Sequence, residues 1–263
     1  MTDRITDRIE IVNADCYTLL DAWPSDAALV TDPPYGIALP TNYAATRRAA
    51  EARDTRRHAW PGREHKDAMH GDDRAFDPTP FLRFKTLCLW GAQNYADRLP
   101  ARYSWLAWDK RDARGAKCHL GDAELAWCSG VPFNSVRMFH HLWIGYQRDS
   151  EVGEGSLHPT QKPVALLAWA LETCAVTDGL VIDPFMGSGS LGVACHRAGL
   201  RYMGVEIDPD HYATAKARLQ RETAQGLLFM PNSPIRPNAP RERTAVAGTL
   251  DGVVGNSGGN DNG

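Results

Sequence analysis

Apolar segments that read as β-strands alternate with helical stretches through most of this chain. The strand-like segments lie at residues 9–13, 27–31, 86–90, 103–108, 180–183 and 202–206. Helical patterns are expected at residues 16–22, 78–85 and 164–175, and near residues 190 and 210. One or two further strands, expected to be antiparallel, lie within residues 134–147. Strands and helices that alternate at this spacing favour a mainly parallel sheet with helices on both faces, so the sequence predicts an α/β, Rossmann-like fold.

The composition limits how the chain can be organised. At 263 residues, of which 43% are hydrophobic, one globular domain suffices, and we expect it to span residues 1–230. Residues 231–263 are rich in Pro, Gly and Asn, and this composition predicts a disordered tail. The formal net charge of −3 argues against a protein that coats nucleic acid in general, so any basic surface must be local.

The cysteines, the histidines and the hydropathy pattern exclude several classes of protein. Six cysteines are scattered without a Cys-x-x-Cys pair, which fits a reducing compartment and argues against a zinc ribbon or a disulfide framework. No apolar run is long enough to span a bilayer and no signal peptide is evident, so we expect a cytoplasmic protein. The side chains of His65, His70, Asp72 and Asp73 lack a standard zinc spacing, and no metal is expected.

The tetrapeptide Asp32-Pro33-Pro34-Tyr35 directly follows the apolar run at residues 27–31. Two adjacent prolines fix the backbone and remove two amide donors, and each disfavours helix at the residue before it. A carboxylate and an aromatic ring are therefore held on a stiff loop at the carboxyl end of a strand. Ligands bind at this edge in open α/β sheets. The plainer alternative is a rigid turn with a buried tyrosine.

A second motif joins a strand, a glycine-rich turn and a helix. The strand ends at Asp183, and the turn that follows contains Phe185, Gly187 and Gly189. The glycine spacing matches neither a phosphate loop nor the dinucleotide fingerprint. Glu206 ends the next strand about 20 residues later, where an acidic side chain can accept hydrogen bonds from ribose hydroxyls. These features predict a site for an adenosine-containing cofactor without a pyrophosphate. The alternatives are a strand-end cap for Asp183 and a solvent-facing strand end for Glu206.

These two motifs, together with the segment His158-Pro159-Thr160-Gln161-Lys162-Pro163, resemble the hallmark motifs of DNA methyltransferases that act on exocyclic amino groups. The resemblance covers most of residues 9–222. The catalytic motif precedes the cofactor motif, an order that resembles the circularly permuted β type of the family. The resemblance implies a class I methyltransferase fold, S-adenosylmethionine as the cofactor and double-stranded DNA as the partner. A homodimer is suggested by analogy with the family alone.

By this resemblance, the loop at residues 32–35 is catalytic. Asp32 and the Pro33 carbonyl would accept the two protons of the target amino group, Pro34 belongs to the same stiff loop, and Tyr35 would stack on the flipped base. The amino nitrogen would then attack the methyl group in line. Adenine is the favoured target because the family's cytosine enzymes more often carry Ser at the position of Asp32. Methylation of cytosine N4 is the close alternative.

The resemblance also implies contacts with the cofactor. Thr160 and Lys162 are expected to bind its methionine carboxylate, and Phe185 is expected to pack on it. Asp15 resembles the family's acidic residue near the adenine amino group of the cofactor. Two of these residues have a structural alternative, since Asp15 could cap a helix and Phe185 could belong to the core.

A basic insert at about residues 40–75 interrupts the alternation of strands and helices. Between Arg47 and Lys66, seven basic residues accompany three acidic ones. Long loops are uncommon in compact domains and are usually functional or disordered. One interpretation is a lid that contacts DNA through Arg47, Arg48, Arg53, Arg56 and Arg57. The other interpretation is a solvated helix with arginine–glutamate pairs.

Two further functions fit parts of the sequence. A DNA-binding module could retain the fold without catalysis, but the intact acidic loop and glycine turn count against it. A methyltransferase acting on protein or RNA could use a related loop to methylate planar amides. The segment at residues 158–163 favours DNA over protein and RNA as the substrate.

Overall fold

The structure, a computed structural model, describes residues 1–36, 71–101, 103–111, 121–131, 134–144, 147–152 and 161–224. The tail expected at residues 231–263 lies outside these residues. So do the five arginines that were assigned to DNA binding and Thr160 of the predicted cofactor site. The predictions made for these positions therefore stay predictions.

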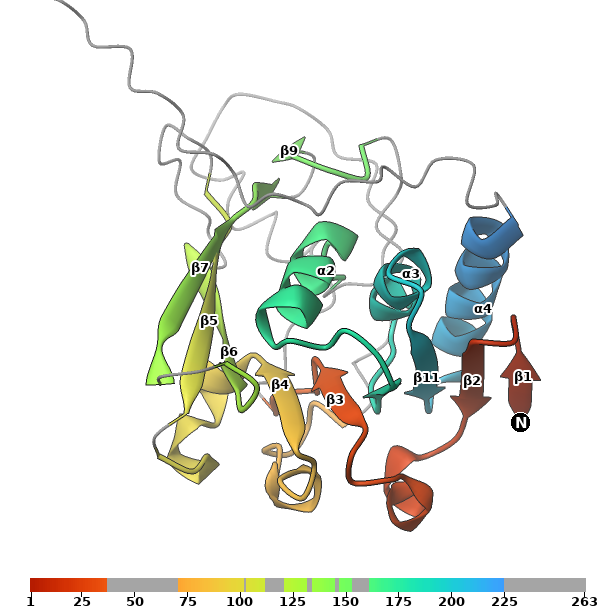
Figure 1. Ribbon diagram of the computed structural model, residues 1–263, viewed down its shortest axis with the longest axis horizontal. Coiled ribbons are helices and arrows are strands. Elements are labelled where there is room, and N and C mark those ends of the chain that lie inside the picture. The colour runs from red at the N-terminus through yellow and green to blue at the C-terminus, as the bar shows by residue number, and fades with distance from the viewer. Residues whose placement is uncertain are drawn as a thin grey trace, which may run out of the picture. The chain divides into compact units, whose positions relative to one another are not determined.

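A nine-stranded sheet forms the centre of the described chain, in the order β1-β2-β11-β10-β3-β4-β6-β5-β7 (Figure 1). The strand bounds are β1 Thr2–Arg4, β2 Ile9–Asn13, β3 Ala28–Thr31, β4 Thr86–Trp90, β5 Ser104–Asp109, β6 Ala123–Cys128, β7 Val136–His140, β10 Leu180–Asp183 and β11 Arg201–Glu206. The five neighbours from β2 to β4 run parallel, whereas β1 and β6 are antiparallel to the strands beside them. The predicted α/β fold with a mainly parallel sheet is confirmed.

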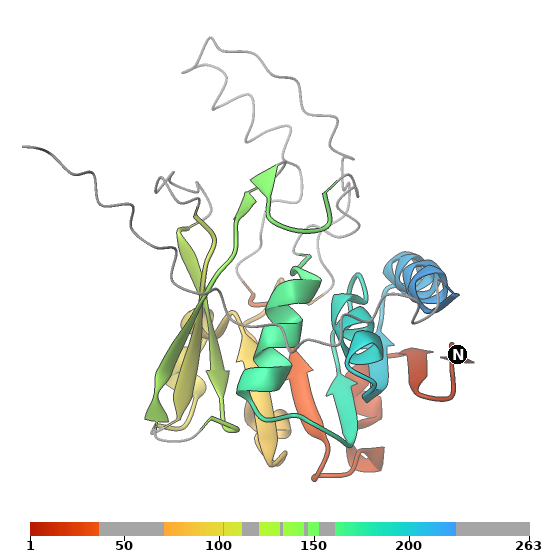
Figure 2. The same ribbon diagram turned by 45° about the horizontal axis from the view of Figure 1, so that its top comes forward.

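Each face of the sheet has its own core, because successive side chains of a strand point to opposite faces. Val30 and Trp90 belong to the core under three α-helices: α2 Val164–Thr173, α3 Ser190–Arg197 and α4 Pro209–Ala224 (Figure 2). Leu29 and Leu89 belong to the core of the other face, together with Phe81. That face is covered by 3₁₀ helices: η1 Cys16–Thr18, η2 Leu20–Ala22, η3 Thr79–Phe81, η4 Ala92–Asn94 and η5 Ala96–Arg98. The first three take the place of the helices expected at residues 16–22 and 78–85, and the last two were not predicted.

The part of the sheet beyond β4 differs from the prediction. Strand β6 was not predicted, and it lies between β4 and β5, antiparallel to both. Strand β7 was expected to be antiparallel but pairs with β5 in parallel. The reason is that β6 returns the chain to the end of the sheet where β5 begins, so β7 starts there too and runs in the direction of β5. A separate antiparallel pair follows, formed by β8 Trp143–Ile144 and β9 Gln147–Arg148.

Strand order brings the two sequence motifs together. Strand β10 lies between β11 and β3, with Val181 opposite Ala28 and Ile182 opposite Leu29. The carboxyl ends of these parallel strands therefore meet at one edge of the sheet. Asp32 follows β3 at this edge, and Asp183 ends β10 beside it.

Two features are absent from the described residues. No helix among them is both long enough and apolar enough to cross a membrane. Within the same ranges, no three His, Cys, Asp or Glu side chains are grouped so that they could hold a metal ion.

Candidate active site

The loop after β3 is fixed at its far end by a residue from beyond the insert. The Gly36 N–H donates a hydrogen bond of 2.8 Å to the carboxylate of Asp72, whose side chain is buried. Gly36 has a φ of +74°, and a side chain there would overlap the Arg74 carbonyl. The positive φ and the close backbone contact both require glycine. This clamp, added to the two prolines, holds Asp32 in one place.

Tyr35 lies against the strand that neighbours its own. Its ring packs over Gly91, which follows β4 with a φ of +68° and has no room for a Cβ atom. Its hydroxyl donates a hydrogen bond to Oδ1 of Asp32. The ring expected to stack on a target base therefore also lies beside the acid expected to catalyse the reaction.

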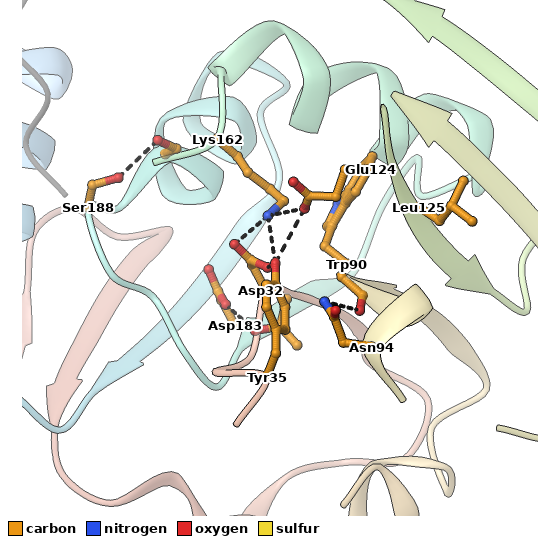
Figure 3. A network of polar contacts seen from close by, with 12 residues as sticks. Asp32, Tyr35, Trp90, Asn94, Glu124, Leu125, Lys162, Asp183 and Ser188 are labelled. Carbon is orange, nitrogen blue, oxygen red and sulfur yellow. Dashed lines mark hydrogen bonds and ion pairs between the residues drawn. The ribbon is translucent and has the colours of Figure 1, made fainter. Parts of the chain in front are cut away.

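Lys162 forms the centre of a network of polar contacts at Asp32 (Figure 3). Its buried ammonium pairs with Oδ2 of Asp32 and lies 2.6 Å from Oε1 of Glu124. The other oxygen of Glu124 lies 2.9 Å from the ammonium of Lys110. Two carboxylates and two ammonium groups thus alternate in space, and the Lys162 charge lies 5.8 Å from the centre of the Trp90 ring.

The pKa values of the two carboxylates in this network are shifted in opposite directions. Burial is the main cause that raises the pKa of Asp32, and the Glu124 charge adds to it while Lys162 opposes it. Burial also acts to raise the pKa of Glu124, but Lys162 and Lys110 together outweigh burial and hold that pKa at about 2. Burial disfavours the Lys162 ammonium, yet the two carboxylates raise its pKa. Glu124 therefore stays ionised, and Asp32 is the carboxylate that takes up a proton more readily.

The glycine turn is held by Glu206 at the end of β11. Gly187 and Gly189 have φ values of +51° and +73°, in the left-handed region that favours glycine. The Gly187 N–H donates to one carboxylate oxygen of Glu206 at 2.9 Å, and the Asp208 N–H donates to the other at 2.9 Å. Burial raises the pKa of Glu206 against the effect of these two hydrogen bonds. The contact with a ribose that the sequence predicts for Glu206 stays a prediction.

A pocket of about 430 Å³, part of it open to solvent, connects the two motifs. Its lining includes Asp32, Lys162, Asp183, Phe185 and Gly187. The lining thus combines charged side chains, a glycine backbone and an aromatic ring, which suit a cofactor that has a charged end and an adenine. The pocket is the part of the described structure where the predicted catalytic and cofactor residues come together.

Several predicted residues have a structural partner that the sequence could suggest only as an alternative. The exposed Asp15 caps η1, since its carboxylate accepts a hydrogen bond of 3.0 Å from the Tyr17 N–H. Phe185 lines the pocket and also packs edge-on against Phe76 and Phe81, with ring centroids 5.9 Å apart in each pair. Asp15 and Phe185 thus have structural roles, and their cofactor contacts stay predictions. Lys162, expected at the methionine carboxylate, has Asp32 and Glu124 as its partners in this structure.

Glu124 and Lys110 were missed by the sequence reasoning. A signal was present, because Glu124 shares one side of its strand with Ala126 and Cys128, both of which are buried. A charged residue in line with buried apolar ones is unusual unless it has a partner. Finding it required the strand itself, which was not predicted.

Comparison with known proteins gives a consistent family. The profile of a family described as DNA methylase matches residues 87–217. A type II methyltransferase of Lactococcus lactis subsp. cremoris is 28% identical over 144 residues, or 52% of this chain and 51% of the relative. Another from Streptococcus pneumoniae is 27% identical over 138 residues, or 51% and 50%. A type II methyltransferase of Streptomyces caespitosus is 36% identical over 93 residues, or 35% and 30%.

The chain belongs to the DNA methylase family, and the resemblance inferred from its motifs is confirmed. It spans about half the length of the first two relatives.

Proposed function

We propose that this DNA methylase transfers a methyl group from S-adenosylmethionine to the exocyclic amino group of adenine in double-stranded DNA. The observation that carries the proposal is that Asp32 and the glycine turn line one pocket. A methyl donor held by the turn and an amino group held by Asp32 would then meet at one edge of the sheet. The type II methyltransferases among its relatives support DNA as the substrate.

The residues of the pocket suit this cofactor. Gly187 lines the pocket and lets the backbone approach a nucleoside closely, and Glu206 keeps the turn in that shape through the Gly187 N–H. Gly189 packs against α4 instead, where a Cβ atom would lie 3.3 Å from Ala215. Phe185 offers an aromatic surface at the pocket wall. When bound, S-adenosylmethionine supplies a methyl group already activated by a positively charged sulfur, so the protein has to provide position and electrostatics.

The chain's own groups would act on the target base. An exocyclic amine is a weak nucleophile because its lone pair is delocalised into the ring. Asp32 and the Pro33 carbonyl would accept its two hydrogens, and this draws the nitrogen towards a tetrahedral shape. Tyr35 would stack on the base after it has left the duplex, which costs a few kcal/mol that stacking of about 1–3 kcal/mol can offset.

The choice of adenine rests on Asp32. Cytosine enzymes that resemble this chain more often carry Ser at the first position of the loop. A carboxylate accepts the amino hydrogens more strongly than a hydroxyl because it is charged.

The test is to express the chain in a bacterial strain that lacks its own DNA methylases and to sequence the host DNA with detection of modified bases. We expect N6-methyladenine within one short sequence motif. The matched control is Asp32→Ala, which should bind S-adenosylmethionine nearly as well in calorimetry but lose methyl transfer by roughly 10²–10⁴-fold. N4-methylcytosine would correct the target base. Unmodified DNA from a folded, cofactor-binding protein would refute the proposal.

A further inference from the structure

Glu124 has a position that the proposed chemistry does not yet use. Each of its carboxylate oxygens binds a different lysine: Oε1 lies 2.6 Å from Lys162 and Oε2 lies 2.9 Å from Lys110. Its side chain is largely buried, at 12% exposed, and comes from β6 on the far side of β4 from Asp32. Burying a charge is costly unless it is paired, so this arrangement needs both lysines.

Both oxygens of Asp32 are engaged in the structure. The Tyr35 hydroxyl donates to Oδ1, and Lys162 pairs with Oδ2. A target amino group that approaches Asp32 would therefore compete with the Tyr35 hydroxyl and the Lys162 ammonium for the oxygens of Asp32. Both donors are also within reach of Glu124, because Oε1 lies 2.6 Å from the Lys162 ammonium and 3.4 Å from the Tyr35 hydroxyl.

We propose that Glu124 is a positioning residue that holds Lys162, and receives the Tyr35 hydroxyl, when Asp32 turns to the target amino group. This inference rests on the proposed function. Lys110 completes this arrangement because it pairs with Oε2 of Glu124 and leaves Oε1 for Lys162 and the Tyr35 hydroxyl.

The atoms and charges balance in this step. In the proposed reaction, the lone pair of the amino nitrogen would form the new C–N bond while the bond between the methyl group and the sulfur breaks, and the electrons of that bond would stay on sulfur. The nitrogen then gives one proton to Asp32, which releases it to solvent. Lys162, Lys110 and Glu124 keep their charges throughout, so Asp32 is the member of the network whose charge changes, and it regains that charge when it releases the proton.

The charged and titratable groups that act on Asp32 come from each element around it. Tyr35 lies on its own loop, Lys162 precedes α2, and Glu124 lies on β6. Asp32 also interacts electrostatically with Asp183 of β10 and with Tyr95, which follows η4. Within this set, Glu124 is the negatively charged group that pairs with the same lysine as Asp32.

The first test needs no activity and follows the Asp32 carboxyl carbon by NMR during a pH titration, with the signal assigned from Asp32→Asn. Glu124→Gln removes a negative charge and leaves Lys162 to Asp32 alone, so the pKa of Asp32 should fall by about one pH unit. Lys110→Met removes a positive charge, so that pKa should rise. Glu222→Gln is the control, because Glu222 also lies between two cations, Arg197 and Arg221. It should leave the pKa unchanged.

The second test measures single-turnover methyl transfer to unmethylated bacterial DNA across a range of pH. Glu124→Gln should lower the rate about tenfold and move its acid limb to lower pH, with an unchanged Kd for S-adenosylmethionine. Glu124→Asp keeps the charge and should recover part of the rate. The acid limb is the readout that a merely structural role would leave in place.

The outcomes separate this inference from the proposed function. An unmoved Asp32 pKa in both Glu124→Gln and Lys110→Met would overturn the positioning role, whether or not the protein methylates DNA. An active wild type with an equal rate in Glu124→Gln would overturn it as well. A wild type that transfers no methyl group to any DNA would refute the proposed function, while the titration would still decide the network. If Glu124→Gln does not fold, Lys110→Met and Glu124→Asp carry the test.

Discussion

The Thr31 hydroxyl donates a hydrogen bond of 2.7 Å to the carboxylate of Asp183, and both side chains are buried. The bond joins the last residue of β3 to the last residue of β10. Tyr202 donates to the same carboxylate at 3.3 Å. The loop at residues 32–35 and the glycine turn therefore start beside one shared, buried acid, which fixes the distance between them.

This acid makes stability depend on pH. Burial raises the pKa of Asp183 to about 7, although hydrogen bonds from Thr31 and the Phe185 N–H act to lower it. An aspartate in the unfolded chain has a pKa near 3.8. Between these values the folded state holds a proton that the unfolded chain releases, so the free energy of unfolding should fall as pH rises from about 4 to about 7.

Asp183→Asn keeps an acceptor for Thr31 and removes this titration. Urea denaturation at a series of pH values should show a flatter profile for the variant, with an advantage of a few kcal/mol over the wild type near pH 7. Asp178→Asn, at an exposed position, should follow the wild-type profile. Parallel profiles for Asp183→Asn and the wild type would contradict the assignment.

Gly91→Ala should displace the Tyr35 ring. The added methyl would overlap that ring, and the φ of +68° would also be strained. We expect at least a tenfold loss in kcat/KM for DNA in steady-state methylation assays. Gly199→Ala has a similar φ of +70° but open space around it, so it carries the strain without the collision. A similar loss of activity in both variants would assign the effect to backbone strain.

Gly187→Val should weaken cofactor binding. The residue has a φ of +51°, which a β-branched side chain strongly disfavours, and its N–H has to point at Glu206. We expect about a tenfold increase in the Kd for S-adenosylmethionine by calorimetry. Gly179→Val, at a φ of +86° with nothing nearby, is the control for strain alone. Equal affinities in Gly187→Val and the wild type would remove the glycine turn from the cofactor site.

The arginine insert gives a prediction that comes from the sequence. If Arg56 and Arg57 contact phosphates, replacing both with Gln should weaken DNA binding and reduce the slope of log K against log salt by about 2. Fluorescence anisotropy across a salt series measures this slope. Replacing the exposed Arg4 and Arg201 removes the same charge elsewhere and should leave the slope unchanged. An unaltered slope in the first variant would make the insert a solvated surface.

The motifs were predictable from the sequence because their signals are local. Strands β3 and β10 are short apolar runs, and each is followed within a few residues by one that constrains or frees the backbone: Pro33 after β3 and Gly187 after β10. Parallel strands place their carboxyl ends at one edge, so Asp32 and Asp183 could be expected near each other. That Asp32 and Asp183 lie close together then follows from the order and direction of the strands alone.

The network around Lys162 could not be predicted in the same way. Its partner Glu124 lies on β6, whose place between β4 and β5 depends on pairings that no single segment specifies. The resemblance to the family therefore implied a role for Lys162 at the cofactor, with no indication of a second carboxylate. The predicted direction of β7 was wrong for the same reason, since the direction of this strand depends on where β6 ends.

The engaged oxygens of Asp32 matter for an enzyme that handles an alkylating agent. A bare carboxylate beside a sulfonium is itself a nucleophile, and its attack would esterify the protein and inactivate it. In this structure, Oδ1 of Asp32 accepts a hydrogen bond from the Tyr35 hydroxyl and Oδ2 pairs with the Lys162 ammonium, so both oxygens have a partner. These contacts would thus protect Asp32 from being methylated until a target base binds and competes with Tyr35 and Lys162 for its oxygens.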